Sequence, residues 1–193
     1  MIDIAKKFFN YRSYTPIPFL LLMFVFQKAN VQSMIAGFLI ALCGELIRFW
    51  GVSWAGSETR TTGGVGGTFL IVSGPFAYTR NPLYVGNILL YTGFGIMSFA
   101  LFPYLQIAAL IFFFIQYYYI VKEEESFLIK KFGEDFESYL KNVPRFFPRF
   151  TAYKIDNAEQ PEFNLQAGLR SEKRSLQAFV IVTIILIVLM VIV

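Results

Sequence analysis

Two short polar segments of this chain carry residue types that could bind a charged small molecule. The first is Arg80-Asn-Pro-Leu-Tyr84, and the second is the acidic run Glu123 to Glu125. Residues 81–121 between them contain no Asp, Glu, Lys or Arg. Because one membrane crossing needs about 20 apolar residues, this stretch predicts two membrane helices joined by a tight turn. Such a hairpin returns the chain to the surface it left, so Arg80 and the glutamates should face each other there and form a site for a charged ligand.

The first segment has the features of a helix start. Pro82 suits the first helical turn because it has no amide hydrogen, and it disfavours helix at Asn81, which makes Asn81 a candidate N-cap. Unpaired amides beside Arg80 would favour an anionic group such as a carboxylate or phosphate. The alternative is an ordinary capped helix with an arginine and Tyr84 at the membrane interface.

The acidic run needs a compensating cation. Three adjacent carboxylates repel one another, and we place them at the C-terminal end of an apolar helix, where the helix dipole disfavours negative charge. Local candidates for the cation are Lys122, Arg80, Arg145 or a cationic ligand. The alternative is a charged cluster that marks the membrane boundary.

Composition and hydropathy predict an all-α integral membrane protein with about five transmembrane helices. The chain is 56% hydrophobic, more than a soluble domain of 193 residues could bury. We expect spans at residues 14–27, 31–54, 83–101, 103–121 and 177–193. Phe127 to Leu140 has the spacing of an amphipathic helix at the membrane surface, ended by Asn142 and Pro144. We divide the chain into a membrane domain at 1–150, a polar linker at 151–176 and a C-terminal transmembrane helix at 177–193.

Charge and missing residue types limit the function further. The chain has no histidine and a single cysteine, Cys43, which excludes the usual catalytic triads and predicts no metal site. With five spans and a cytoplasmic N-terminus, every basic residue except Lys28 lies inside. The net charge of +4 therefore reflects topology, and we expect no nucleic-acid partner. The glycine-rich loop 63–67 lacks the Lys-Ser/Thr of a phosphate loop. Glu45 and Arg48 could pair or line a cavity.

The segment Gly74-Pro-Phe-Ala-Tyr-Thr-Arg-Asn-Pro-Leu-Tyr-Val-Gly86 resembles the hallmark segment of the isoprenylcysteine carboxyl methyltransferase and phospholipid methyltransferase superfamily. Glu124-Glu125-Ser-Phe-Leu128 and Val143-Pro-Arg-Phe-Phe-Pro148 also fit, in the same order and spacing. The resemblance covers about residues 45–150. It implies a pocket for S-adenosylmethionine at the cytosolic membrane surface and a lipid or lipidated methyl acceptor.

The resemblance also implies roles for individual residues. The methyl donor would be bound by Arg80, Tyr84, Gly86, Glu124 and Glu125. Asn81 and Arg145 would be the catalytic positions, with Arg145 near the acceptor or closing the pocket. Arg80 suits the carboxylate of the donor, and Glu124 or Glu125 suits its ammonium or ribose hydroxyls.

Three questions stay open from the sequence. Prenylcysteine methyltransferases typically have His at the position of Asn81, whereas phospholipid-type members can carry Asn-Pro there. Asn81 therefore disfavours an isoprenylcysteine carboxylate as the acceptor, but the choice between it and a phospholipid amine stays open. The helix at 177–193 lies outside the resemblance and is expected to serve as an anchor or to form a homo-oligomer. The competing function is a non-catalytic scaffold or transporter component that has kept the fold. We expect the bacterial inner membrane as the location.

Overall fold

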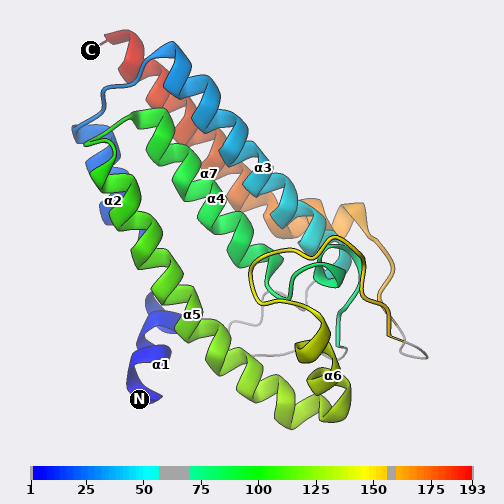
Figure 1. Cartoon of the computed structure of the whole chain (residues 1–193). Coiled ribbons are helices and arrows are strands. Elements are labelled where there is room, and N and C mark those ends of the chain that lie inside the picture. The colour runs from blue at the N-terminus through cyan, green and yellow to red at the C-terminus, as the bar shows by residue number, and fades with distance from the viewer. Residues whose placement is uncertain (1, 57–69, 156–159, 193) are drawn as a thin grey trace. The chain divides into compact units, whose positions relative to one another are not determined.

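The computed structural model describes residues 2–56, 70–155 and 160–192. These residues form seven α-helices, one short 3-10 helix and no strand (Figure 1). The all-helical prediction is therefore confirmed for the described parts of the chain. The glycine loop 63–67 and the middle of the expected linker lie outside the described residues. The helices are α1 (Ile2–Tyr11), α2 (Pro16–Val25), α3 (Val31–Ala55), η2 (Gly74–Ala77), α4 (Pro82–Ser98), α5 (Tyr104–Phe132), α6 (Glu134–Asn142) and α7 (Leu165–Ile192).

Three described helices are long and apolar enough to cross a membrane: α3, α5 and α7. Of the other expected spans, α2 has 10 residues and α4 has 17. The helix starts follow local sequence signals. Asn30 and Ser33 form a reciprocal capping pair at the start of α3, with N···O distances of 3.0 and 2.9 Å. Pro82 is the first residue of α4, as predicted.

Two helix boundaries differ from the expected ones. Helix α5 does not end near Val121 but continues through the acidic run to Phe132, because no Pro or Gly interrupts residues 104–132. The three glutamates therefore lie inside a helix and not at its C-terminal end. The break comes at Gly133, whose φ of 55° is easily adopted only by glycine, and the chain turns sharply into α6 there (Figure 1).

The last helix is also longer than expected. Helix α7 begins at Leu165, well before the apolar stretch that starts at Gln177. Asn164 caps its first turn, because its side-chain oxygen accepts a hydrogen bond from the amide of Ala167 at 2.9 Å. A polar stretch that looked like linker is thus partly helix.

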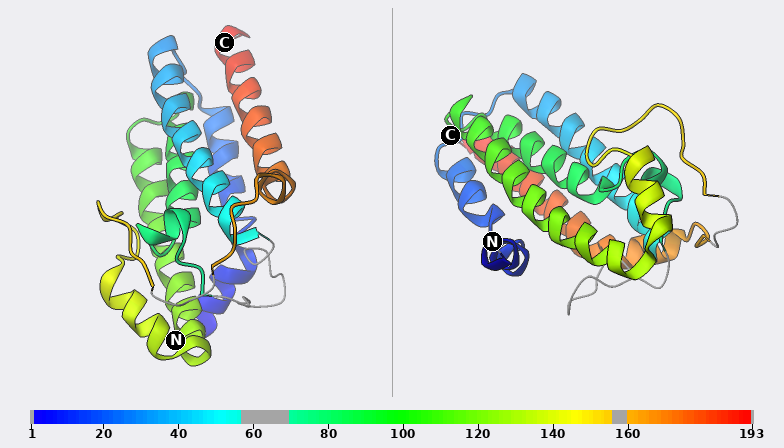
Figure 2. Two further views of the ribbon diagram at one scale, coloured as in Figure 1. Left: turned by 90° about the vertical axis from the view of Figure 1, so that its right-hand side faces the viewer. Right: turned by 60° about the horizontal axis from the view of Figure 1, so that its bottom comes forward.

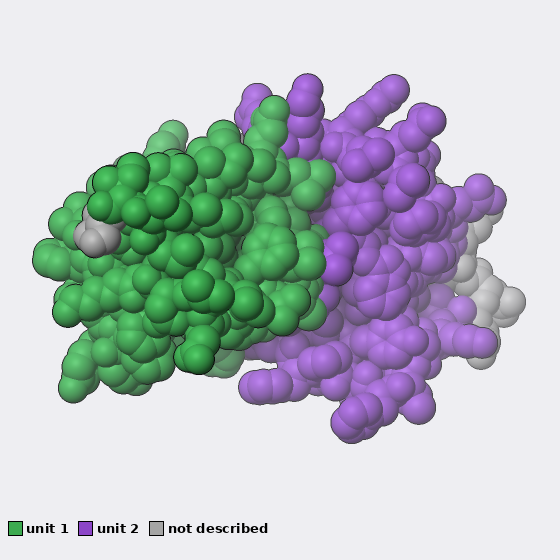
Figure 3. All heavy atoms as spheres, turned by 90° about the horizontal axis from the view of Figure 1, so that it is seen from above, with its two compact units in different colours: residues 1–45, 86–120, 175–193 green, residues 46–85, 121–174 purple. Residues whose placement is uncertain are grey.

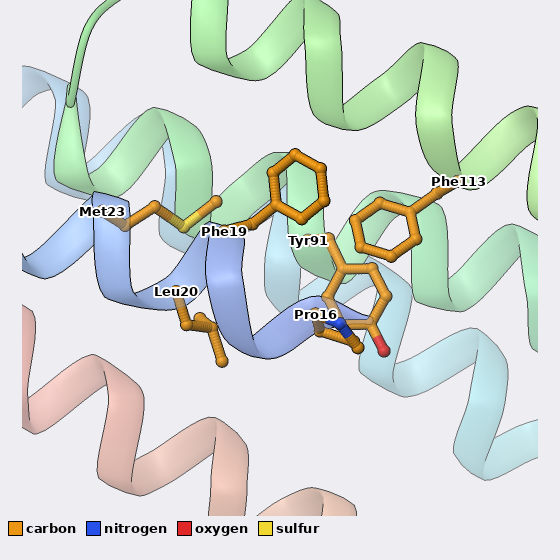
Figure 4. A pocket seen from close by; sticks show the side chains of 6 residues that line it. All are labelled: Pro16, Phe19, Leu20, Met23, Tyr91 and Phe113. Atoms are coloured by element: carbon orange, nitrogen blue, oxygen red, sulfur yellow. The ribbon is translucent and has the colours of Figure 1, made fainter. Parts of the chain in front are cut away.

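The chain forms two compact units, coloured separately in Figure 3. The first unit comprises residues 1–45, 86–120 and 175–193, and its core joins α2, α3, α4, α5 and α7. Helices α3 and α4 approach closely through Gly37 and Gly93, and Phe179 of α7 packs on Phe38 and Phe94. An apolar hollow in this unit is lined by Pro16, Phe19, Leu20, Met23, Tyr91 and Phe113 and leaves no room for a water molecule (Figure 4).

The second unit comprises residues 46–85 and 121–174. Its apolar centre is formed by Val72, Phe136, Tyr139 and Val143, so α6 packs its apolar side against this unit. The single amphipathic helix expected over Phe127 to Leu140 is instead divided at Gly133 between α5 and α6. A buried ion pair joins α3 to the first turns of α7: Arg48 contacts Glu172 at 2.7 Å, and Glu172 is only 2% exposed. Charges removed from water in this way are tolerated only when they are paired.

Gln160 holds the segment that leads into η2. Its side-chain oxygen accepts hydrogen bonds from the amide of Val72 at 2.9 Å and the hydroxyl of Ser73 at 3.0 Å. Its side-chain nitrogen donates to the carbonyl of Leu70 at 3.0 Å. These three hydrogen bonds, which we call the Gln160 clamp, fix the segment of the chain before Gly74.

Replacing Gln160 by Ala is expected to lower the free energy of unfolding by about 2 kcal/mol, because three hydrogen bonds are lost and their partners are left unsatisfied. Thermal unfolding in detergent micelles measures this change. The matched control is Gln166→Ala, at an exposed position on α7, which should leave stability unchanged. Equal stability of the two variants would show that the clamp contributes nothing.

Candidate functional site

The candidate site lies wholly within the second unit, where three segments meet. These are the turn before α4, the stretch of α5 that carries the glutamates, and the loop after α6. The turn before α4 is fixed by backbone contacts with that loop: the amide of Arg80 donates to the carbonyl of Pro144 at 3.0 Å. The side-chain nitrogen of Asn81 donates to the carbonyl of Arg145 at 3.1 Å. Asn81 thus stands directly before α4 and uses its side chain to hold the loop.

Glu125 lies between two arginines. Arg80 approaches it with Nε at 3.0 Å and Nη2 at 2.9 Å, and Arg145 contacts both carboxylate oxygens with Nε and Nη2. Glu125 is 8% exposed, so the pairing removes its charge from water without leaving it uncompensated. The predicted meeting of Arg80 with the acidic run is confirmed, and two of the proposed cations, Arg80 and Arg145, are identified.

Arg80 is the more buried of the two arginines, and its side chain also contacts backbone carbonyls. Besides its two contacts with Glu125, its Nη1 donates to the carbonyls of Leu140 and Val143. A guanidinium has five hydrogen-bond donors, so four of those on Arg80 are directed at groups of this chain. These two carbonyls could not be predicted from the sequence, because every residue has a carbonyl and no side-chain pattern indicates which one will accept a hydrogen bond.

Glu124 makes a separate contact. Its carboxylate accepts a hydrogen bond from the hydroxyl of Tyr84 at 2.7 Å, and both side chains are partly exposed. Glu123, on the same turn of α5, is exposed. The acidic run therefore divides into three roles: one carboxylate in solvent, one partly exposed beside a tyrosine, and one buried between arginines. The spacing alone could not distinguish them, because it did not fix which face of α5 is covered.

Gly86 belongs to the first unit, unlike the other predicted site residues. It is buried, and its carbonyl oxygen lies against Gly44 of α3, where an added Cβ would be 2.5 Å from it. Close helix packing accounts for this contact.

Tyr139 of α6 holds η2, the short helix just before the turn that carries Arg80. Its hydroxyl donates to the carbonyl of Phe76 in η2 at 2.7 Å, and the residue is 2% exposed. Burial is the main reason that the pKa of Tyr139 lies above its ordinary value; Arg80 opposes this shift, and Glu125 adds to it. The hydroxyl therefore stays protonated in the folded protein and keeps its hydrogen bond.

Stability should accordingly fall at alkaline pH. The raised pKa in the folded state contributes stability that is fully present below the unfolded pKa of about 10 and is lost as pH rises above it. Replacing Tyr139 by Phe should cost about 1 kcal/mol at neutral pH through the lost hydrogen bond, and should flatten the alkaline part of the profile. Thermal unfolding between pH 7 and about pH 11 measures both effects. An unchanged slope in the variant would assign the alkaline loss to other groups.

Comparison with known proteins identifies the family. Residues 32–135 match the phospholipid methyltransferase family, which is more than half of the chain. The chain belongs to this family. The match includes Arg80, Tyr84 and the acidic run but ends before Arg145. A search of curated proteins found no match. Family membership and the long apolar helices together make the chain a membrane protein of a methyltransferase family.

The residues present fit the methyl donor that the family implies. S-adenosylmethionine carries a carboxylate, an ammonium and ribose hydroxyls. The partly exposed Glu124 can accept from an ammonium or a hydroxyl, and the site also carries arginines of the opposite charge. No group of three or more potential metal ligands occurs in the described part of the chain.

Proposed function

We propose that the protein is an S-adenosylmethionine-dependent methyltransferase that acts on a lipid or lipidated acceptor at the membrane. The observation that carries the proposal is the paired arrangement of Tyr84 with Glu124 and of Arg80 with Glu125, on segments inside the family match. The order and spacing of the family-like motifs and the contacts between side chains all point to the same four residues. The acceptor is a phospholipid amine or an isoprenylcysteine carboxylate.

The four side chains would divide the work. Glu124 and Tyr84 would bind the ammonium or ribose hydroxyls of the donor, because they combine partial exposure with a fixed hydrogen bond. Arg80 and Glu125 would fix the shape of the site, and the positive charge of Arg80 would attract the donor carboxylate.

When bound, S-adenosylmethionine supplies an activated methyl group. What the chain must add is orientation of the acceptor and exclusion of water. We assign the acceptor side to Asn81 and Arg145, which are joined by the hydrogen bond from Asn81 to the carbonyl of Arg145. Arg145 keeps 28% of its side chain exposed, more than Arg80 does, so it is the arginine better placed to meet a second molecule.

We further propose that the site faces the cytoplasm, in a five-span topology of a bacterial inner membrane. The distribution of basic residues along the chain supports this orientation. The exposed apolar side of α7 would meet lipid or a second copy of the chain.

Titration of the purified protein with S-adenosylmethionine by calorimetry tests the donor site. The wild-type protein should bind saturably, and Glu124→Gln should weaken binding by roughly tenfold, the loss expected for one charge-assisted hydrogen bond. Glu123→Gln is the matched control, because its side chain is exposed on the same turn, and it should bind as the wild type does. If the folded protein shows no saturable binding, the non-catalytic scaffold or transporter function is favoured instead.

A further inference from the structure

The loop after α6 presents two aromatic side chains to the surroundings. Phe147 is 79% exposed and Phe150 is fully exposed. Many other exposed apolar side chains lie on α3, α5 and α7, the helices long and apolar enough to cross a membrane, where lipid would cover them. Phe147 and Phe150 lie outside every candidate span of the described chain, in the yellow segment that follows α6 in Figure 2. Their exposure therefore needs another explanation.

The backbone of this loop is fixed by hydrogen bonds. The amide of Arg149 donates to the carbonyl of Tyr78 at 2.9 Å, and the amide of Tyr153 donates to the carbonyl of Ala77 at 2.9 Å. The Arg149 side chain also reaches back to the carbonyl of Asn142 at 2.8 Å. The two phenylalanines are thus held outward on an ordered segment, where water alone would be an unfavourable neighbour.

The charge of the same region is one-sided. Residues 138–155 contain the basic residues Lys141, Arg145, Arg149 and Lys154 and no Asp or Glu. Lys141 and Lys154 are exposed. Aromatic rings among basic residues are the combination found at the boundary between lipid and water, where the rings enter the headgroup layer and the cations attract anionic lipids.

We propose that residues 146–150, which we call the aromatic loop, dock on the membrane surface and prefer anionic lipid. Phe147 and Phe150 enter the interfacial layer, while Lys141 and Lys154 contact acidic headgroups. The loop begins next to Arg145, so docking would also hold the acceptor side of the site at the lipid surface. That consequence rests on the proposed function, whereas the docking itself does not.

Site-directed spin labelling of the full chain in nanodiscs tests the docking. In a Cys43→Ala background, which removes the only cysteine, labels are attached to Phe147→Cys, Phe150→Cys and the control Glu137→Cys, an exposed position on α6. Collisions with oxygen, which concentrates in lipid, are compared with collisions with a water-soluble nickel complex. The two loop labels should favour oxygen several-fold more than the control label does. The difference should grow when phosphatidylglycerol is added to phosphatidylcholine.

The charge part of the proposal has its own variant. Lys141→Gln combined with Lys154→Gln should abolish the increase caused by phosphatidylglycerol. Loop labels as accessible to nickel as the control would overturn the docking. Labels shielded from both reagents would overturn it too, in favour of a protein contact. Donor binding is measured on the same samples, so a failure of the docking and a failure of the proposed function can be told apart.

Discussion

Replacing Glu125 by Ala is expected to lower the free energy of unfolding by about 3–5 kcal/mol, the usual cost of breaking a buried ion pair from one side. The substitution leaves Arg80 and Arg145 close together without the carboxylate that now separates their charges. Arg80 would keep its bonds to the carbonyls of Leu140 and Val143, so the repulsion should displace Arg145 first. The loop after α6 would then lose its main side-chain contact with α5.

Thermal unfolding in detergent micelles measures the effect, and Glu123→Ala is the control. Both substitutions remove one carboxylate from the same helical turn, but Glu123 is exposed and should be neutral within about 0.5 kcal/mol. The double substitution of Arg145→Met with Glu125→Gln should recover part of the loss, because it removes one of the two opposed cations. If Glu125→Ala and Glu123→Ala unfold at the same temperature, the ion-pair account of the site is wrong.

Replacing Gly93 by Ala is expected to cost about 3 kcal/mol, at the upper end of ordinary overpacking. An added Cβ would lie 2.6 Å from the carbonyl oxygen of Gly37 and 2.6 Å from the Cβ of Ala41. These neighbours belong to the backbone and first side-chain atom of α3, so no rotamer change can relieve the clash. Helices α3 and α4 would have to separate.

Gly95→Ala provides the comparison, two residues along the same helix. Its added Cβ would lie 3.2 Å from Cγ of Gln106 and 3.4 Å from Cε of Met23, so it overlaps no backbone atom, and the gain in helix propensity of up to about 1 kcal/mol offsets part of the cost of shifting the hydrogen-bonded Gln106 by a few tenths of an ångström. Chemical unfolding of the two variants in mixed micelles should therefore separate them clearly. Similar stabilities would mean that the close approach of α3 and α4 is not a requirement of the fold.

The pairing of Arg80 with the acidic run could be predicted from the sequence, because these opposite charges lie at the two ends of an uncharged, apolar stretch. An uncharged stretch bounded by Arg80 on one side and three glutamates on the other must bring opposite charges to one surface, and the structure pairs Arg80 with Glu125. The role of Asn81 was foreseen only in part. It stands directly before α4, but its side chain binds the carbonyl of Arg145.

Helix boundaries were harder to predict where composition changes without a break in the backbone. The change from apolar to charged residues after Val121 suggested a new helix, yet residues 122–132 contain no Pro or Gly and are mostly Glu, Lys and Leu, which favour helix, so α5 continues. Residues 165–176 were assigned to a linker because they are polar, although Asn164 offered a cap and a polar sequence can be helical. The clamp at Gln160 depends on long-range contacts to Leu70 and Val72, which no local pattern reveals.

The most direct test of the account is transfer of a labelled methyl group. Membranes that contain the protein are incubated with S-adenosylmethionine labelled in its methyl group, and label is counted separately in lipid, protein and small soluble products. The account predicts label in the lipid or lipidated-protein fraction, strongly reduced by Glu124→Gln and unchanged by Glu123→Gln. Label confined to small soluble products, or equal labelling in membranes with and without the protein, would contradict it.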